Sequence, residues 1–187
     1  DNSSYTMADA VFTACFLNAM NRNCDIVGMA NFAPVLNTRG CIYSYKDGIV
    51  LRSTYHVFDL YVNYLGDTVI DLWAENEIPM ITVKHKYGNM VSVEQVDILA
   101  TKWQNKAGMA IAAVNKHRTE SQVLKICTRM EKDVFNATIY SICGDTENSY
   151  NDIGRNEVSI MKSELGKCGT ELTVELKPHS VNIIQLL

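Results

Sequence analysis

The sequence lacks the residue spacings that mark most reactive centres. It contains no GxSxG elbow, no Walker loop and no GxGxxG fingerprint. Its histidines, His56, His85, His117 and His179, do not approach HxH or HExxH spacing, and its cysteines form no CxxC pair. His56 and Asp59 lie one turn apart on an expected helix, which is a spacing typical of a solvated helix face. We therefore predict no metal, no cofactor and no catalytic residue in this chain.

The chain also lacks a strong excess of either charge. Its 187 residues include 17 basic and 21 acidic side chains, a formal net charge of -4. This balance gives no electrostatic reason to expect nucleic acid or an anionic membrane as a partner. The longest apolar run, 107–114, is far too short to cross a bilayer. No charged segment followed by an apolar one opens the sequence, so we expect no signal peptide. We predict that the chain binds neither nucleic acid nor membrane.

The six cysteines carry no sign of a disulfide framework. Cys15, Cys127 and Cys143 lie inside apolar runs, as free cysteines do when they act as small core hydrophobes. The chain is also longer than the miniproteins that depend on disulfides. We interpret the cysteines as reduced structural thiols, which favours a cytoplasmic location.

The first segment with a clear pattern is 5–22, YTMADAVFTACFLNAMNR. Its apolar residues cover most of a helical surface, and only Asp9 and Thr13 form a polar stripe in the middle. A helix that is apolar over most of its surface is normally buried in a larger body. The sequence therefore predicts a helix over 5–22 that needs partners on several sides.

The next segment, 26–61, predicts a strand, a loop and a helix. Residues 26–30 form a short apolar run, as in a strand covered on both faces. The loop that follows ends in the turn signal Lys46-Asp47-Gly48. A helix then fits from Thr54 to Leu65, with Gly66 closing it. A strand, a loop at its carboxyl end and a helix form one βα unit, and such loops carry chemistry in α/β barrels.

After Gly66 the periodicity changes from helical to alternating. Short strands with polar turns between them indicate an antiparallel sandwich or barrel. We predict these strands at 68–73, 96–101, 108–114, 123–127, 134–143, 158–161, 172–176 and 181–187. The chain is thus predicted to divide near residue 75 into a slice of an α/β body, 1–75, and a β-sandwich, 76–187.

Two long motifs resemble one enzyme family. GMANFAPVLNTRG, continued by YKDGIVLRSTYHVFDLY, is similar to the end of the catalytic barrel in the α-L-arabinofuranosidases of glycoside hydrolase family 51. The preceding YTMADAVFTACFLNAMNRNCDIV resembles the helix before the eighth barrel strand. VNKHRTES, SYNDIGRNEV and the closing LKPHSVNIIQLL agree with the same family, so the resemblance covers nearly the whole chain.

The resemblance implies an α+β fragment: the last helix-strand-helix of a TIM (β/α)8 barrel followed by an antiparallel β-sandwich of jelly-roll type. It implies a parent enzyme that hydrolyses terminal α-L-arabinofuranosyl residues of arabinoxylan and arabinan oligosaccharides with retention. Retention uses two carboxyl groups about 5 to 5.5 Å apart. In the family these are glutamates on the fourth and seventh strands, which lie before this chain. We therefore expect this chain alone to be inactive, with the rest of the barrel and the arabinose-containing oligosaccharide as its partners and a homo-oligomer as its assembly.

One residue of this chain is a candidate for substrate binding by the same resemblance. Family members place a polar amide residue at the end of the eighth strand, after an alanine, and this position matches Asn31 after Ala30. The alternative role for Asn31 is to cap the strand and start the turn, which its side chain suits equally well.

Two other functions stay open from the sequence. The sandwich could be a stand-alone carbohydrate-binding module or an oligomerisation module. The very apolar helix at 5–22 and the lone barrel strand argue against both, because neither kind of module needs them.

Overall fold

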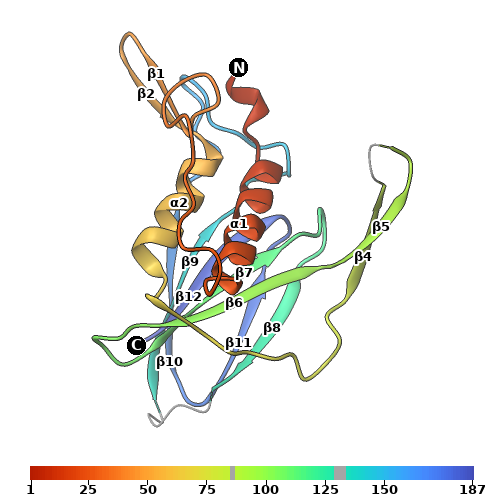
Figure 1. Ribbon diagram of the computed structural model, residues 1–187, viewed down its shortest axis with the longest axis vertical. Coiled ribbons are helices and arrows are strands. Elements are labelled where there is room, and N and C mark those ends of the chain that lie inside the picture. The colour runs from red at the N-terminus through yellow and green to blue at the C-terminus, as the bar shows by residue number, and fades with distance from the viewer. Residues whose placement is uncertain (85–86, 129–133) are drawn as a thin grey trace.

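The computed structural model describes residues 1–84, 87–128 and 134–187. Both α-helices lie in the first 64 residues, and the remainder of the chain is β-rich (Figure 1). In chain order they are η1 (Asn2–Ser4), α1 (Met7–Arg22), β1 (Ile42–Tyr45), β2 (Gly48–Leu51), α2 (Ser53–Tyr64), β3 (Thr68–Ile70), β4 (Met80–Lys84), β5 (Met90–Glu94), β6 (Val96–Lys102), β7 (Met109–Asn115), β8 (Gln122–Cys127), β9 (Phe135–Ile142), β10 (Met161–Cys168), β11 (Glu171–Leu176) and β12 (Ser180–Leu186).

Helix α1 forms where the sequence predicts a helix. It begins with a capping box, in which the Asp9 carboxylate accepts a 2.8 Å hydrogen bond from the backbone N–H of Thr6. Met7, Ala10, Ala14 and Asn18 are buried, whereas the next face carries Phe12 and Phe16, which are 70% and 57% exposed. Within this chain, α1 is therefore covered on one side only.

Helix α2 lies within one residue of the predicted 54–65, but Gly66 has a different role from the one expected. The helix ends at Tyr64 and Leu65 is extended, so no left-handed glycine closes it. A Cβ atom on Gly66 would lie 2.4 Å from the carbonyl oxygen of Lys102. Glycine is needed here because the chain passes close to the backbone of β6 as it leaves the helix.

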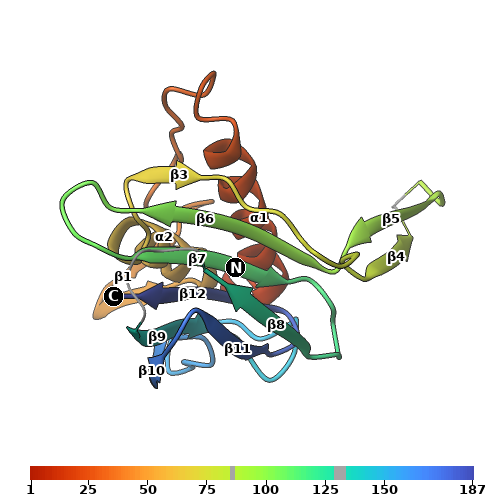
Figure 2. The same cartoon turned by 90° about the horizontal axis from the view of Figure 1, so that it is seen from below.

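A six-stranded antiparallel sheet in the order β10-β9-β12-β7-β6-β3 forms the centre of the fold (Figure 2). Helices α1 and α2 pack side by side on one face, over Leu99, Ala112 and Ile183. The two-stranded sheet β11-β8 covers the other face, over Ile111, Ala137 and Ile184. Both faces of the central strands are therefore buried, which confirms the expectation of a β-sandwich in the second half of the chain.

Buried polar groups join the helices to the sheet. The Tyr61 hydroxyl donates to the Asn18 side-chain oxygen at 2.6 Å, and the Asn18 amide donates to Asp97 at 2.9 Å. At the end of α2, the Gln185 amide donates to the carbonyl oxygen of Tyr64 at 2.7 Å. Because buried polar groups are costly unless they are paired, these bonds fix how α1 and α2 sit on the sheet.

The strand predicted at 26–30 does not form. Residues 27–35 have no regular structure, and Ile26 and Met29 are 78% and 80% exposed. A strand requires a neighbouring strand to satisfy its backbone groups, and none of the described residues pairs with this segment. The segment therefore has the apolar pattern of a buried strand but no paired neighbour among the described residues.

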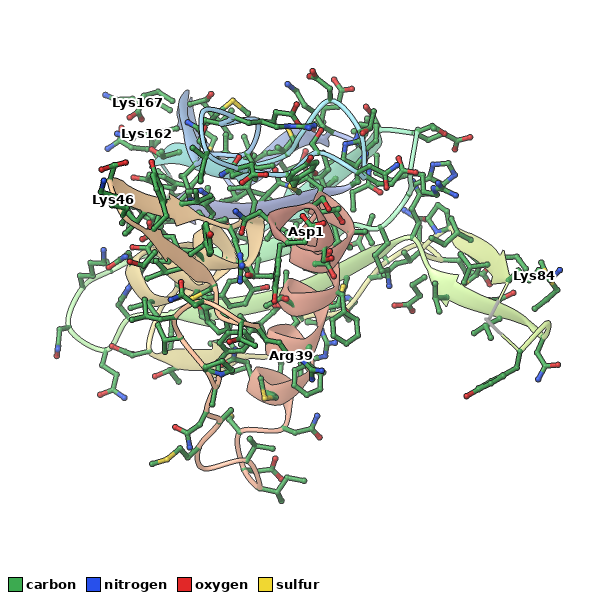
Figure 3. The ribbon with its side chains drawn as sticks, turned by 90° about the horizontal axis from the view of Figure 1, so that it is seen from above. Asp1, Arg39, Lys46, Lys84, Lys162 and Lys167 are labelled. Atoms are coloured by element: carbon green, nitrogen blue, oxygen red, sulfur yellow. The ribbon has the colours of Figure 1, made fainter. Side chains whose placement is uncertain are left out.

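Three further segments differ from the prediction. The loop after residue 31 contains the hairpin β1-β2, with Lys46 and Asp47 in its turn. A second hairpin, β4-β5, projects from the body and carries Lys84 far from the other labelled residues (Figure 3). The strand predicted at 158–161 lies instead at β10, an edge strand whose side chains are mostly exposed.

The predicted division near residue 75 stays a prediction. Segments on either side of it are packed together, since β3 pairs with β6 and both helices lie on the sheet. Among the described residues, no helix has the length and apolar character needed to cross a membrane.

Replacing Leu60 with alanine tests the packing of α2. Leu60 is fully buried between α2 and the sheet, whereas Val62 on the same helix is 79% exposed. Leu60→Ala should lower the free energy of unfolding by roughly 2 to 5 kcal/mol. Val62→Ala, measured by the same chemical denaturation, should change it by about 0.5 kcal/mol or less. Equal effects of the two substitutions would mean that α2 does not pack on the sheet.

Candidate functional site

The candidate residue Asn31 lies in the irregular segment between α1 and β1. It is exposed, and its side chain forms no hydrogen bond with any of the described residues. The turn that follows is shaped by another amide: Asn37 has a φ of 52°, and its side-chain oxygen accepts a 2.7 Å hydrogen bond from the N–H of Ser44. Both the donor and the acceptor of the Asn31 amide are therefore available to a ligand.

A buried arginine, Arg52, lies beneath this segment at the junction of β2 and α2. Only 1% of its surface is exposed. Its Nη1 donates to the carbonyl oxygen of Asn37 at 3.2 Å and to that of Gly40, and its Nε donates to the side-chain oxygen of Asn2 at 2.8 Å. The guanidinium lies 3.9 Å from the centre of the Tyr5 ring, which is cation–π distance.

The contacts of Arg52 continue to the long loop between β9 and β10. The Asn2 amide that meets Arg52 also donates to Asp152 at 2.7 Å. This bond and the backbone N–H of Ile153 hold the pKa of the Asp152 carboxyl below its ordinary value. We call Arg52, Asn2 and Asp152 the polar junction. It brings together residues that are 50 and 150 positions apart in the sequence.

The neighbouring Asn151 ties the same loop to the end of β2. Its amide donates to the carbonyl oxygens of Leu51 at 2.8 Å and Val158 at 2.7 Å. Its oxygen accepts from the N–H groups of Glu157 and Val158 at 2.9 and 2.8 Å. Every hydrogen-bonding position of this side chain is used, so Asn151 holds structure and is not free for a ligand.

The junction contains no pair of carboxyl groups, since Asp152 is its one acid. The described residues contain no group of three or more His, Cys, Asp or Glu side chains that could hold a metal ion, and His85 lies outside them. Two surface hollows, of about 340 Å³ beside Lys116 and about 200 Å³ beside Trp103, share no residue with the junction. The contacts of the polar junction therefore hold the segment between α1 and β1 and the loop between β9 and β10 in place.

The comparisons with known proteins agree on one family. Residues 1–180 match the family model of the Alpha-L-arabinofuranosidase C-terminal domain. The chain belongs to this family. A probable alpha-L-arabinofuranosidase C from Aspergillus terreus is 26% identical over 160 residues, which are 85% of this chain and 31% of that protein. Alpha-L-arabinofuranosidase C of Emericella nidulans is 24% identical over 162 residues, 86% of this chain and 31% of that protein.

Solved structures share the fold of this C-terminal domain. The alpha-L-arabinofuranosidase from Thermotoga maritima, solved as an arabinose complex, superposes with a TM-score of 0.85 at 28% identity, over 98% of this chain and 39% of that one. The thermostable GH51 enzyme of Thermotoga petrophila gives a TM-score of 0.85 at 27% identity, over 98% and 39%. The C-terminal domain thus spans about a third of the length of the curated relatives it matches.

Sequence reasoning proposed Asn31, whose role stays a prediction, and missed the polar junction. Arg52 and Asp152 lie in the motifs YKDGIVLRSTYHVFDLY and SYNDIGRNEV, which carry part of the family resemblance. A charged or polar residue inside such a motif is the signal that could have singled them out. Their contact with each other through Asn2 depends on the tertiary fold and leaves no mark on local spacing.

The buried His56 next to Asn151 gives this C-terminal domain a defined acid sensitivity. Burial lowers the pKa of His56 below its ordinary value of about 6.5. The unfolded chain therefore takes up a proton at a pH where the folded chain does not, so stability is fully present above about pH 6.5 and falls as the pH drops below it. The lowered pKa of Asp152 has its effect at lower pH. Its contribution to stability is present above the ordinary pKa of about 3.9 and is lost as the pH falls below it.

His56→Gln should reduce the loss of unfolding free energy between pH 7.5 and about 5.5, because glutamine does not titrate. Urea denaturation at both pH values, for wild type and variant, measures it. The same pH dependence in both proteins would show that His56 does not cause it.

Proposed function

We propose that this chain forms the C-terminal portion of an α-L-arabinofuranosidase that releases terminal α-L-arabinofuranosyl residues from arabinoxylan and arabinan oligosaccharides. The two catalytic glutamates of a retaining glycosidase lie in the preceding part of the enzyme. The chain contributes the last helix-strand-helix of the TIM barrel and the sandwich that supports it. Asn31 reaches the arabinose at the end of the eighth barrel strand.

One observation carries this proposal: the apolar surface of α1 and of the segment after it is left uncovered. Phe12 and Phe16 are exposed on α1, and Ile26, Met29 and Val35 are 78%, 80% and 53% exposed. A monomer rarely exposes large apolar side chains together unless another body covers them. Since the relatives are about three times longer, the missing part of the barrel is the body that fits.

The same segment supports a role as a barrel strand. Its apolar run suits a parallel strand buried on both faces, and it lacks neighbouring strands only within this chain. Once paired on both sides, residues 26–30 would lead to Asn31 at the carboxyl end, where barrel enzymes assemble their sites. A self-standing binding module would have no use for this run or for the phenylalanine face of α1.

Assembly and location belong to the proposal as well. A homo-oligomer of the parent enzyme follows from the family resemblance, and the six free cysteines fit a cytoplasmic protein. Light scattering of the parent enzyme measures the first, and fractionation of the source cells the second.

The chain alone should not hydrolyse an aryl α-L-arabinofuranoside. It lacks the carboxyl pair, so no group can form the glycosyl-enzyme or protonate the leaving group. Purified chain at high concentration should release aryl alcohol no faster than buffer, whereas the full-length parent should turn over. Activity that follows this chain through a sizing column would overturn the proposal.

Asn31→Ala in the full-length parent should weaken catalysis without unfolding the enzyme. The substitution removes one hydrogen-bonding contact with the sugar, a loss of roughly 1 to 3 kcal/mol. That loss corresponds to about a 5- to 150-fold decrease in kcat/KM. Asn63→Ala is the matched control and should leave kcat/KM unchanged, because Asn63 is an exposed residue of α2 whose amide donates to Asp59 on the same helix. Unaltered kinetics of Asn31→Ala, with an active wild type, would assign Asn31 to turn formation.

A further inference from the structure

We propose that Arg52 is a positioning residue for the reaction: it fixes the segment 35–42 and thereby the placement of the loop that carries Asn31. This inference rests on the proposed function, because it assigns the loop to the sugar site. Arg52 itself does not touch the substrate, since it is buried beneath the loop with only 1% of its surface exposed. It acts through the backbone that it holds.

The burial of Arg52 is costly and calls for a specific use. None of its partners among the described residues is a carboxylate in direct contact, since they are two backbone carbonyl oxygens, the Asn2 side chain and two aromatic rings. A buried charge that lacks a counter-charge is destabilising unless its hydrogen bonds compensate. Two of those bonds end on the carbonyl oxygens of Asn37 and Gly40, so the arginine is directed at the loop backbone.

Backbone hydrogen bonds within the segment 35–42 close it into a compact loop, but they do not attach it to the rest of the domain. The N–H of Asn37 donates to the carbonyl oxygen of Ile42 at 2.8 Å, and the N–H of Ile42 donates to that of Val35 at 3.1 Å. A Cβ atom on Gly40 would lie 2.2 Å from the carbonyl oxygen of Val35, so the loop is tightly closed. These bonds set its shape and leave its orientation to contacts with other elements.

Contacts at both ends of the loop set that orientation. At the near end, the ring of Phe32, next to Asn31, packs at 5.1 Å against Phe58 of α2. At the far end, Arg52 holds two carbonyl groups, and the Tyr5 hydroxyl donates to the carbonyl oxygen of Thr38 at 3.1 Å. The segment that carries Asn31 is therefore held at both ends, by the contact between Phe32 and Phe58 and by the hydrogen bonds of Arg52 and Tyr5. Of these hydrogen bonds, Arg52 donates the two to Asn37 and Gly40.

Arginine is required at this position because of its shape. Its planar guanidinium donates in three directions at once while one face stacks on the Tyr5 ring at 3.9 Å and another contact reaches the Tyr43 ring at 5.6 Å. A lysine ammonium could supply the charge but could not hold Asn37, Gly40 and Asn2 in one plane. The link through Asn2 to Asp152 also gives the loop between β9 and β10 the same anchor.

The first test uses the chain itself and does not depend on its activity. Amide hydrogen exchange is followed for Asn37 and Ile42 in wild type, Arg52→Met and Arg118→Met. Arg118 is the matched control because its guanidinium is 74% exposed and pairs with Glu147 at the surface. We expect exchange of both amides to become at least about tenfold faster in Arg52→Met relative to Ile183 of β12, because the segment 35–42 loses its anchor whereas the central sheet keeps its own contacts. Unchanged relative exchange would overturn the inference.

The second test measures kcat and KM in the full-length parent, at a temperature where all variants are folded. Misplacement of a site loop by about 1 Å can cost on the order of 100-fold in rate, so Arg52→Met should lower kcat by about 10- to 100-fold per folded molecule. Arg52→Lys should recover melting temperature more than kcat, whereas Arg118→Met should match wild type in both. A residue with a purely structural role would leave kcat per folded molecule unchanged, and that result would overturn the inference.

The two tests separate this inference from the proposed function. An inactive wild-type parent would contradict the proposed function, and with it the link to the reaction. Wild-type kcat in Arg52→Lys would show that charge suffices, which also contradicts a positioning role that depends on the planar guanidinium.

Discussion

The structure depends on two central strands, β7 and β12, that are buried on both faces. Nearly every residue of the two is inaccessible to solvent. Alternate residues face the helices on one side and the sheet β11-β8 on the other. Because a strand buried on both faces cannot shift register without moving every side chain to the wrong layer, this pair determines where α1, α2 and the outer strands attach.

That constraint places the candidate site. With α2 held on the sheet, the junction of β2 and α2 is fixed, and so is Arg52. The loop between β9 and β10 packs against the start of α1 on the same face of the sheet and meets Arg52 through Asn2. The result is a buried polar junction beneath a segment whose upper surface is exposed, so the side chains below hold the backbone above them in place.

Much of the fold could be predicted from the sequence, because the buried elements have strong local patterns. The helices at 5–22 and 54–65 and the strands around 108–114 and 181–187 were found within one or two residues at most of their ends, since burial on a sheet imposes regular apolar spacing. The hairpin β4-β5 and the edge strand β10 were missed or misplaced. Their side chains are mostly exposed, so no burial pattern marks them.

The remaining differences have another origin. Residues 26–30 carry the pattern of a buried strand and do not form one, because a strand needs a paired neighbour and none of the described residues pairs with them. The sequence predicted that Gly66 ends the helix, but glycine is needed there because the backbone of Lys102 leaves no room for a Cβ atom. For the site, the family motifs suggested Asn31, whose contact with substrate stays a prediction, whereas Arg52 and Asp152 became evident only when the fold brought distant segments together.

We propose that this chain completes an arabinoside-cleaving site whose two catalytic carboxyl groups lie in the preceding part of the parent enzyme. The most direct measurement is the rate of aryl α-L-arabinofuranoside hydrolysis by the preceding part of the parent enzyme, expressed with and without this chain. We expect little or no activity for either part alone, and a hydrolysis rate that rises to saturation as this chain is added to the preceding part. Equal activity of the preceding part in the presence and absence of this chain would contradict it.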